Sequence, residues 1–277
     1  MLQINTMRLI LVALSFLLIN TAYATVDTVD VFSNSMKKNI KCVVITPKNY
    51  KKSKDRFPVV YLLHGYGGGY ANWIRKVPVI DSLADVYQMM IVCPDGAFSS
   101  WYVNSPVDSS FRYETFTGVE LPGYIDANFR TIATKKARAI SGLSMGGFGA
   151  YFIALNHAQT FGAAGSMSGA LDISYITVGY DVAKRLGDTT ANRSYYVNWS
   201  IKNLIEKYNP EDGLAFILDC GVKDFIFGMS KNLHEKMLAL KIPHDYTERP
   251  GVHDWNYWGN AVKYQLLFFH EWFKKNK

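Results

Sequence analysis

The sequence predicts an α/β fold in which a mostly parallel central sheet carries helices on both faces. Apolar runs of strand length alternate along the chain with longer amphipathic segments, and this alternation favours parallel strands joined by helical crossovers. Several of the runs are hydrophobic without interruption, as strands that are buried on both faces require. The 277 residues are 49% hydrophobic and show no shift in composition, which predicts a single domain over residues 25–277.

Seven apolar runs are the predicted strands. They cover residues 39–47, 57–65, 87–96, 137–142, 161–169, 213–221 and 242–248. Helical periodicity predicts helices in the gaps between them, near residues 76–87, 113–128, 144–156, 196–208, 229–240 and 255–274. The last helix is the clearest, because "WNYWGNAVKYQLLFFHEWFKK" repeats its aromatic residues at helical spacing.

The first 24 residues have the pattern of a secretory signal peptide. Arg8 precedes an apolar run over residues 9–19, and Ala22 and Ala24 stand in the A-x-A arrangement that signal peptidases cut. The apolar run is short for a membrane span. We therefore expect cleavage after Ala24, a secreted or periplasmic protein, and no stable membrane anchor.

The basic excess of the chain is scattered. Removal of residues 1–24 takes away one basic residue and leaves 29 Lys and Arg against 23 Asp and Glu, a formal charge of +6. The densest basic run, "KNYKKSKDR" at residues 48–56, has no helical stripe of charge and indicates a solvated loop between two strands. No nucleic-acid partner is expected.

Three cysteines, Cys42, Cys93 and Cys220, lie in or at the end of apolar runs. An odd count at distant spacings fits neither a zinc site nor a disulfide framework. Buried free thiols are the favoured interpretation, although one pair could close outside the cytoplasm. No metal or organic cofactor is expected.

One serine lies among four glycines in "RAISGLSMGGFGAY" at residues 138–151. Residues 142–146 form a G-x-S-x-G motif after a predicted strand and before a predicted helix, which is the context of a nucleophile elbow. Such glycines let strand and helix pack closely, while a strained backbone lifts the Ser144 hydroxyl clear of the sheet. The sequence therefore predicts Ser144 as a nucleophile.

A serine nucleophile needs a base and an acid further along the chain, in the order Ser, Asp or Glu, His. Asp224 follows a predicted strand in "LDCGVKDF", and His253 lies in "GVHDWNYW" just before the last helix. Asp219 and Asp254 are the rival acids. Asp219 lies within the strand, and Asp254 is too near His253 along the chain to orient its ring easily.

The glycines of "LLHGYGGG", at residues 62–69, follow the strand that precedes the first predicted helix. Loops of this form donate a backbone N–H to the oxyanion of acyl-transfer intermediates. We expect the N–H groups of Tyr66 and Met145 to form the oxyanion hole. His64 is expected to be structural rather than basic, and it is also counted among the candidate substrate contacts.

Six motifs in order resemble one group of α/β-hydrolases. They are "YLLHGYGG", "SSWYVNSP" (99–106), "YETFTGVELPGYIDANFRT" (113–131), "ISGLSMGGFGA" (140–150), "LDCGVKDF" and "GVHDWNYW". The group is the esterase family that includes feruloyl and acetylxylan esterases, esterase D with S-formylglutathione hydrolase, and the antigen 85 mycolyltransferases. The resemblance runs from about residue 28 to the end of the chain. It implies an eight-stranded sheet, a triad of Ser144, Asp224 and His253, and oxyanion donors at Tyr66 and Met145. One departure is Asn104, where many secreted members have aspartate.

Within this family, the signal peptide and the absence of a cysteine-bearing loop at "HGYGGG" favour a secreted ester hydrolase over a cytosolic S-formylglutathione hydrolase. The segment 170–212 lies where this fold often inserts a lid. Its residues Tyr175, Tyr180, Tyr195, Tyr196 and Trp199 are expected mostly to pack, but with Trp101 and Tyr102 they could wall an acyl pocket. Trp255, beside His253, is a further candidate substrate contact.

The expected function is a secreted serine carboxylesterase that removes feruloyl or acetyl groups from plant cell wall polysaccharide through an acyl-enzyme. A thioesterase or an acyltransferase on the same triad is the alternative enzyme. A catalytically silent, glycan-binding α/β-hydrolase is the alternative from another class, and the intact set of Ser144, Asp224 and His253 argues against it.

Overall fold

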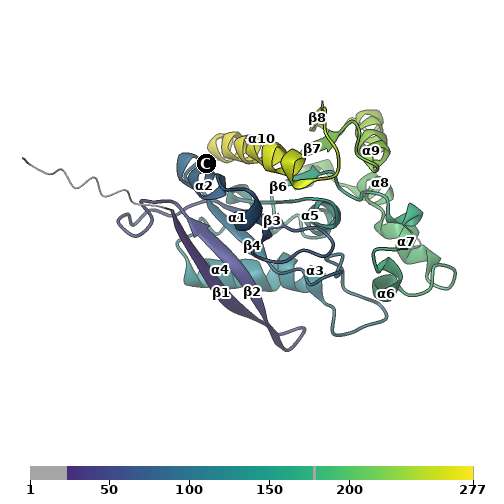
Figure 1. Cartoon of the computed structure of the whole chain (residues 1–277), viewed down its shortest axis with the longest axis horizontal. Coiled ribbons are helices and arrows are strands. Elements are labelled where there is room, and N and C mark those ends of the chain that lie inside the picture. The colour runs from purple at the N-terminus through teal and green to yellow at the C-terminus, as the bar shows by residue number, and fades with distance from the viewer. Residues whose placement is uncertain (1–23, 177–178, 277) are drawn as a thin grey trace, which may run out of the picture.

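A computed structural model describes residues 24–176 and 179–276 of the chain. The predicted signal peptide therefore lies outside the described residues, apart from Ala24. In the described part, one eight-stranded sheet has the strand order β1-β2-β4-β3-β5-β6-β7-β8 (Figure 1). The strands from β4 to β8 in this order pair in parallel, whereas β1 and β2 add an antiparallel edge.

The strands are β1 (Thr25–Ser33), β2 (Lys38–Thr46), β3 (Val59–Leu63), β4 (Met90–Pro94), β5 (Arg138–Gly142), β6 (Ala163–Met167), β7 (Ala215–Gly221) and β8 (Asp245–Arg249). All seven strands predicted from apolar runs are confirmed. The basic run at residues 48–56 is the predicted loop between β2 and β3. Strand β1 was not predicted from its residues, because "TVDTVDVFS" is an edge strand whose first residues are largely exposed.

The helices are α1 (Asn72–Lys76), α2 (Ile80–Val86), α3 (Tyr113–Thr115), α4 (Leu121–Asn128), α5 (Met145–Asn156), α6 (Val182–Leu186), α7 (Arg193–Trp199), α8 (Ile201–Leu204), α9 (Phe227–Ala239) and α10 (Trp255–Lys275). The predicted helix over 113–128 is one helical stretch with a π-helical turn at Phe116–Glu120 between α3 and α4. The helix predicted near 76–87 is confirmed as α2, which begins only after Pro78, whereas the short helix α1 before it was not predicted. Helix α6 was not predicted.

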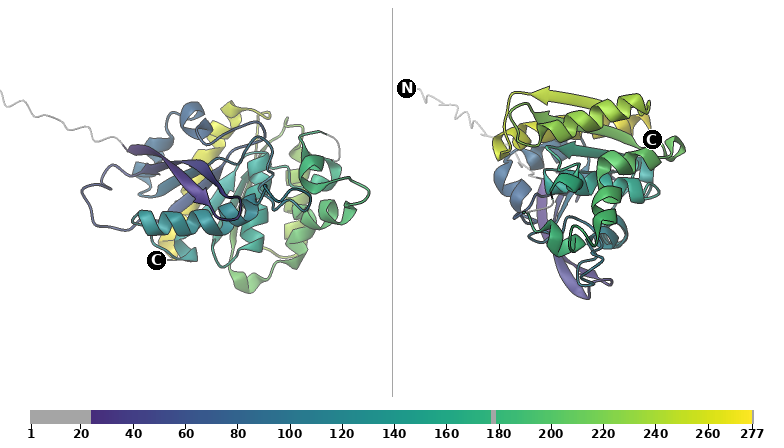
Figure 2. Two further views of the ribbon diagram at one scale, coloured as in Figure 1. Left: turned by 90° about the horizontal axis from the view of Figure 1, so that it is seen from below. Right: turned by 90° about the vertical axis from the view of Figure 1, so that its right-hand side faces the viewer.

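Apolar side chains of the strands alternate between two cores, one on each face of the sheet. In β3, Val59, Tyr61 and Leu63 belong to one core, and Val60 and Leu62 belong to the other. Helices α4, α5 and α9 pack into the first core, and α1, α2 and α10 pack into the second. Figure 2 shows helical segments on both sides of the sheet. This confirms the predicted fold class, and it leaves the carboxyl ends of the parallel strands free to carry a site.

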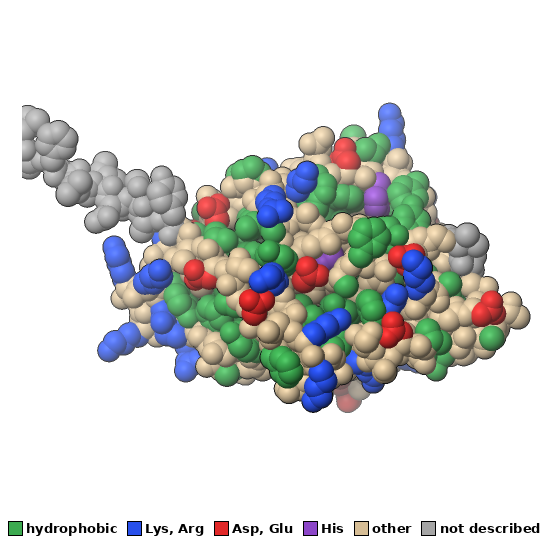
Figure 3. Space-filling model, turned by 60° about the horizontal axis from the view of Figure 1, so that its bottom comes forward, with side chains coloured by type: hydrophobic (Ala, Val, Ile, Leu, Met, Phe, Trp, Pro, Cys, Tyr) green, Lys and Arg blue, Asp and Glu red, His purple; other side chains and the backbone are tan. Residues whose placement is uncertain are grey.

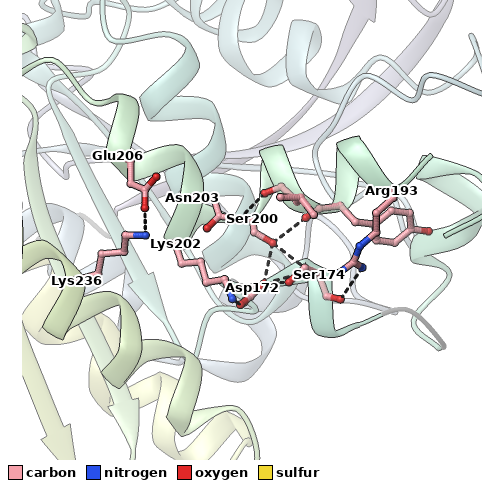
Figure 4. Close-up of polar contacts among 10 residues, drawn as sticks. Asp172, Ser174, Arg193, Ser200, Lys202, Asn203, Glu206 and Lys236 are labelled. Atoms are coloured by element: carbon pink, nitrogen blue, oxygen red, sulfur yellow. Dashed lines mark hydrogen bonds and ion pairs between the residues drawn. The ribbon is translucent and has the colours of Figure 1, made fainter. Parts of the chain in front are cut away.

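The segment 170–212 contains α6, α7 and α8 and connects β6 to β7 (Figure 1). A buried carboxylate fixes its base: Asp172 accepts hydrogen bonds from the Ser200 hydroxyl at 2.8 Å and from the Ser174 backbone N–H at 3.2 Å, and it pairs with Lys202 (Figure 4). Tyr196 is fully buried, as expected of a packing residue. Asp172 thus joins the beginning of the segment to the start of α8.

The three cysteines are free and buried, and burial raises the pKa of each thiol. Cys42 and Cys93 lie on neighbouring strands, but their side chains belong to the cores on opposite faces of the sheet. Among the described helices, none combines the length and the apolarity that crossing a bilayer requires.

Candidate active site

Ser144 lies at a sharp turn between β5 and α5. Its backbone has φ of 52° and ψ of −118°, a left-handed conformation that side-chain-bearing residues rarely adopt, and its N–H donates to the Met167 carbonyl at 3.0 Å. Glycine is required two residues later, because a Cβ atom at Gly146 would lie 2.6 Å from the His64 carbonyl oxygen and 2.7 Å from that of Leu63. The turn is therefore pressed directly against the end of β3.

A continuous chain of hydrogen bonds joins the serine to a histidine and an aspartate. His253 Nε2 lies 3.0 Å from Ser144 Oγ. Its Nδ1 atom lies 2.8 Å from Asp224 Oδ2 and 3.0 Å from Asp224 Oδ1. Since the carboxylate can only accept, Nδ1 carries the proton and leaves Nε2 free to accept one from the hydroxyl. The three residues predicted from the sequence are thus brought together in the order that nucleophilic catalysis needs.

The Asp224 carboxylate is shielded from solvent, with its side chain fully buried. Burial raises its pKa, but hydrogen bonds from His253 and from the Ile226 backbone N–H at 3.0 Å outweigh this effect and hold the pKa below the ordinary value. Asp224 is therefore ionised at neutral pH and fixes the imidazole orientation.

Two aromatic rings hold the imidazole of His253. The Phe225 ring centroid lies 4.6 Å from the imidazole centroid, and the Trp258 ring centroid lies 4.8 Å from it at an angle of 88°. These contacts restrict the ring to the plane in which it reaches both Ser144 and Asp224.

The two rival acids have other partners. Asp219 is buried in β7, where it pairs with Arg249 and accepts a hydrogen bond from the Tyr257 hydroxyl. Asp254 caps α10, with its side chain accepting from the Tyr257 backbone N–H at 2.9 Å. Neither carboxylate is hydrogen-bonded to His253.

The backbone N–H of Tyr66 lies on the loop after β3, and that of Met145 lies at the start of α5, directly after Ser144. Within the described part of the chain, neither N–H donates to a protein acceptor. Met145 is the first residue of α5, so its N–H belongs to the positive end of the helix. The loop of Tyr66 packs tightly on the serine turn, because a Cβ atom at Gly65 would lie 2.6 Å from the Leu143 side chain. Both expected donors are thus free to bind an anion.

His64 and Tyr102 lie beneath this loop. The His64 ring is buried, accepts at Nε2 from the Gly96 N–H at 2.7 Å, and contacts the Gly65 carbonyl through Nδ1 at 2.8 Å. Burial lowers its pKa. The Tyr102 hydroxyl donates to the His64 carbonyl at 3.0 Å. Both side chains therefore support the loop, and the expectation that they contact substrate does not agree with their positions.

Two cavities open at Ser144. A cleft of about 270 Å³ is lined by Gly65, Tyr66, Gly67, Gly68, Asn72, Leu143, Ser144, Tyr180, Phe225, His253, Trp255 and Trp258. A small pocket of about 20 Å³ is lined by Tyr66, Trp101, Ser144, Met145, Ala170, Ile176, Tyr180, Phe225 and Ile226. Of the expected contact residues, Trp101 therefore lines the small pocket and Trp255 lines the cleft.

Tyr180 lines both cavities, as one of the aromatic residues that were expected as possible pocket walls, whereas Phe225 and Trp258 were missed by sequence reasoning. Phe225 directly follows Asp224, so its position could have been inferred from the motif. Tyr180 lies in an irregular stretch and carries no pattern that singles it out. On the face shown in Figure 3, hydrophobic side chains gather around a partly visible histidine, with basic and acidic side chains interspersed around them.

Asn104, the departure from the family pattern, has a structural partner. Its side-chain amide donates to the Thr115 hydroxyl at 2.9 Å and accepts from the Thr115 N–H at 3.1 Å. Across residues 24–176 and 179–276, no group of three or more His, Cys, Asp and Glu side chains is arranged to hold a metal ion.

The strand order and the serine turn after β5 define an α/β-hydrolase. A family model described as "Putative esterase" matches residues 33–269. The chain belongs to this esterase family, and its class of enzyme is the carboxylic ester hydrolases.

The names of similar proteins agree with this class. An acetyl esterase of Caldicellulosiruptor saccharolyticus is 27% identical over 255 residues, which cover 84% of this chain and 94% of that protein. An esterase of Mycobacterium tuberculosis is 40% identical over 237 residues, which cover 76% of this chain but only 51% of that longer protein. A solved structure of a ferulic acid esterase superposes with a TM-score of 0.78 at 28% identity, covering 91% of this chain and 99% of the other.

Proposed function

We propose that this protein is a secreted or periplasmic serine carboxylesterase that removes acetyl or feruloyl groups from plant cell wall polysaccharide. The observation that carries the proposal is the hydrogen-bond chain from Ser144 Oγ through His253 to Asp224, which opens onto a cleft. The acetyl and feruloyl groups are supported by the names of the acetyl esterase and ferulic acid esterase relatives. Export is supported by the residue pattern at 1–24.

In the first half-reaction, Ser144 Oγ attacks the ester carbonyl carbon while His253 Nε2 takes the hydroxyl proton. The carbonyl oxygen becomes an oxyanion that accepts hydrogen bonds from the N–H groups of Tyr66 and Met145. One such donor typically contributes about 10² to 10³ in rate. The Asp224 carboxylate stabilises the imidazolium that forms.

Collapse of the tetrahedral intermediate breaks the bond between the carbonyl carbon and the alcohol oxygen. His253 Nε2 returns the proton to that oxygen, and the alcohol leaves. Water then attacks the acyl-enzyme with His253 again as base, which releases the carboxylic acid and restores the Ser144 hydroxyl.

The test is hydrolysis of p-nitrophenyl acetate and methyl ferulate by the wild type, with Ser144→Ala as the inactive variant and the exposed Ser82→Ala as its matched control. We expect turnover of at least one ester by the wild type and by Ser82→Ala, and none above background by Ser144→Ala. A folded wild type that cleaves neither ester would refute the proposal. Turnover of S-formylglutathione, or transfer to an added alcohol in place of water, would instead identify the alternative enzymes.

A further inference from the structure

The two cavities at Ser144 differ in one respect that bears on substrate choice. The cleft of about 270 Å³ includes His253, whereas the pocket of about 20 Å³ does not. We propose that the small pocket receives the substituent of the acyl group and limits it to the size of a methyl, with Tyr180 as the residue that sets this limit. The inference rests on the proposed esterase function and narrows its substrate class to acetyl esters.

Proton transfer determines which side of the ester enters which cavity. The leaving alcohol must receive its proton from His253 Nε2, so the alcohol oxygen has to lie on the side of Ser144 that faces the imidazole. This is the larger cleft. The substituent of the acyl carbon then points away from His253, past the Met145 N–H and into the small pocket.

The volumes fix the size of each group. A cavity needs about 10 to 15 Å³ of probe volume to hold one water molecule. A pocket of about 20 Å³ therefore holds one group of about that size, such as the methyl of an acetyl ester, and has no room for the phenyl ring of a ferulate. The cleft on the alcohol side is more than tenfold larger, and Trp255, Trp258 and Asn72 offer it aromatic surface and an amide. This combination suits a sugar.

Tyr180 is placed to be the removable wall of the pocket. It lines both cavities and is 47% exposed, and its ring packs edge-on against the Tyr66 ring at 5.4 Å. Its backbone carbonyl accepts a hydrogen bond from Trp101 Nε1 at 2.8 Å. This bond does not involve the Tyr180 side chain, so it holds the backbone at position 180 over the pocket in a substituted variant as well. Phe225 also lines both cavities, but its ring contacts His253. Truncation of Tyr180 should therefore open the pocket without disturbing the imidazole.

The experiment measures kcat/KM for p-nitrophenyl acetate, butyrate and octanoate and for methyl ferulate. It compares wild type, Tyr180→Ala, Tyr180→Phe, and Phe32→Ala as a control that removes a 51%-exposed aromatic ring from the edge strand β1. We expect the wild type to prefer acetate over butyrate at least about tenfold, since one methylene can be worth 10- to 200-fold. Tyr180→Ala should lower that ratio about tenfold or more, and the other two variants should keep it.

The outcomes separate this inference from the proposed function. If the wild type hydrolyses butyrate or methyl ferulate as well as acetate, and Ser144→Ala is inactive, the esterase stands and the size limit is refuted. If the wild type is selective but Tyr180→Ala has the same ratio, Tyr180 does not set the limit. If no ester is turned over by the folded wild type, both proposals fail.

Discussion

His253 Nε2 and Ser144 Oγ lie 3.0 Å apart, although 109 residues separate them along the chain. The two residues come from different connections, one after β5 and one after β8, and both connections lie at the carboxyl ends of the strands. The sheet thereby holds the base and the nucleophile at a fixed separation. Substituting a residue that supports His253 or Ser144 should therefore change kcat or stability, and each substitution can be tested separately.

Asp224→Asn should lower kcat for p-nitrophenyl acetate about 10⁴-fold, because an amide in place of the carboxylate favours the wrong imidazole tautomer and stabilises no cation. Asp254→Asn is the matched control. It makes the same charge change next to His253 and retains an N-cap, so kcat should stay within a few-fold of wild type. A loss smaller than tenfold in Asp224→Asn would show that this carboxylate is not the triad acid.

The same variant should reveal how Asp224 contributes to stability at different pH. Its folded pKa lies below the ordinary value of 3.8, so the ionised carboxylate stabilises the fold above that pH, and the contribution is lost as the pH falls through the lowered folded pKa. Urea unfolding of wild type and Asp224→Asn should give a constant difference in midpoint from neutral pH to about pH 5, and a shrinking difference below it. A difference that grows on acidification would contradict the assignment.

Arg249→Met should destabilise the protein by about 3 to 5 kcal/mol, because it leaves the buried Asp219 carboxylate without its cation. Lys274→Met removes an exposed ion pair with Glu271 and should change the free energy of unfolding by less than about 0.5 kcal/mol. Urea denaturation measures both. Equal effects of the two variants would mean that the Asp219 pair does not support the fold.

Gly146→Ala should cost stability by about 1 to 3 kcal/mol and reduce kcat, since the new methyl group would meet two carbonyl oxygens at the end of β3 and displace the loop that holds Tyr66. Gly123→Ala, in α4, meets no atom within 4 Å and should stabilise by roughly 0.5 to 1 kcal/mol. Thermal unfolding with activity assays will distinguish them. If Gly146→Ala is as stable and active as wild type, the tight packing of the serine turn is not required.

In the native protein, no cysteine thiol should react with Ellman's reagent. In the denatured chain, all 3 thiols should react and give the coloured product. Burial raises the pKa of each thiol, so little thiolate is exposed to attack. Added dithiothreitol should leave the melting temperature unchanged. A drop in melting temperature on reduction would reveal a disulfide.

The buried strands and the three residues of the hydrogen-bond chain could be predicted from the sequence, because each has a recognisable pattern in a short stretch of residues. Continuous apolar runs identify strands buried on two faces, and a glycine-flanked serine identifies a sharp turn. Edge strand β1 has no such run, since Asp27, Thr28 and Asp30 interrupt its apolar residues.

Substrate contacts were harder to predict, because they depend on where irregular backbone sends each side chain. Trp101 and Tyr102 are adjacent, and both have positive φ, at 54° and 53°. That backbone directs Trp101 to the pocket and Tyr102 beneath the loop of His64. Tyr180 also has positive φ, at 50°, and reaches the site from a segment without helical or strand periodicity.

The hydrogen bond between Asp172 and Ser200 joins two residues that are 28 positions apart in the sequence. Ile176 and Tyr180 lie in the stretch between them. Substitutions between these two anchor residues can therefore reshape the small pocket while Ser144, Asp224 and His253, which lie outside the stretch, stay unchanged.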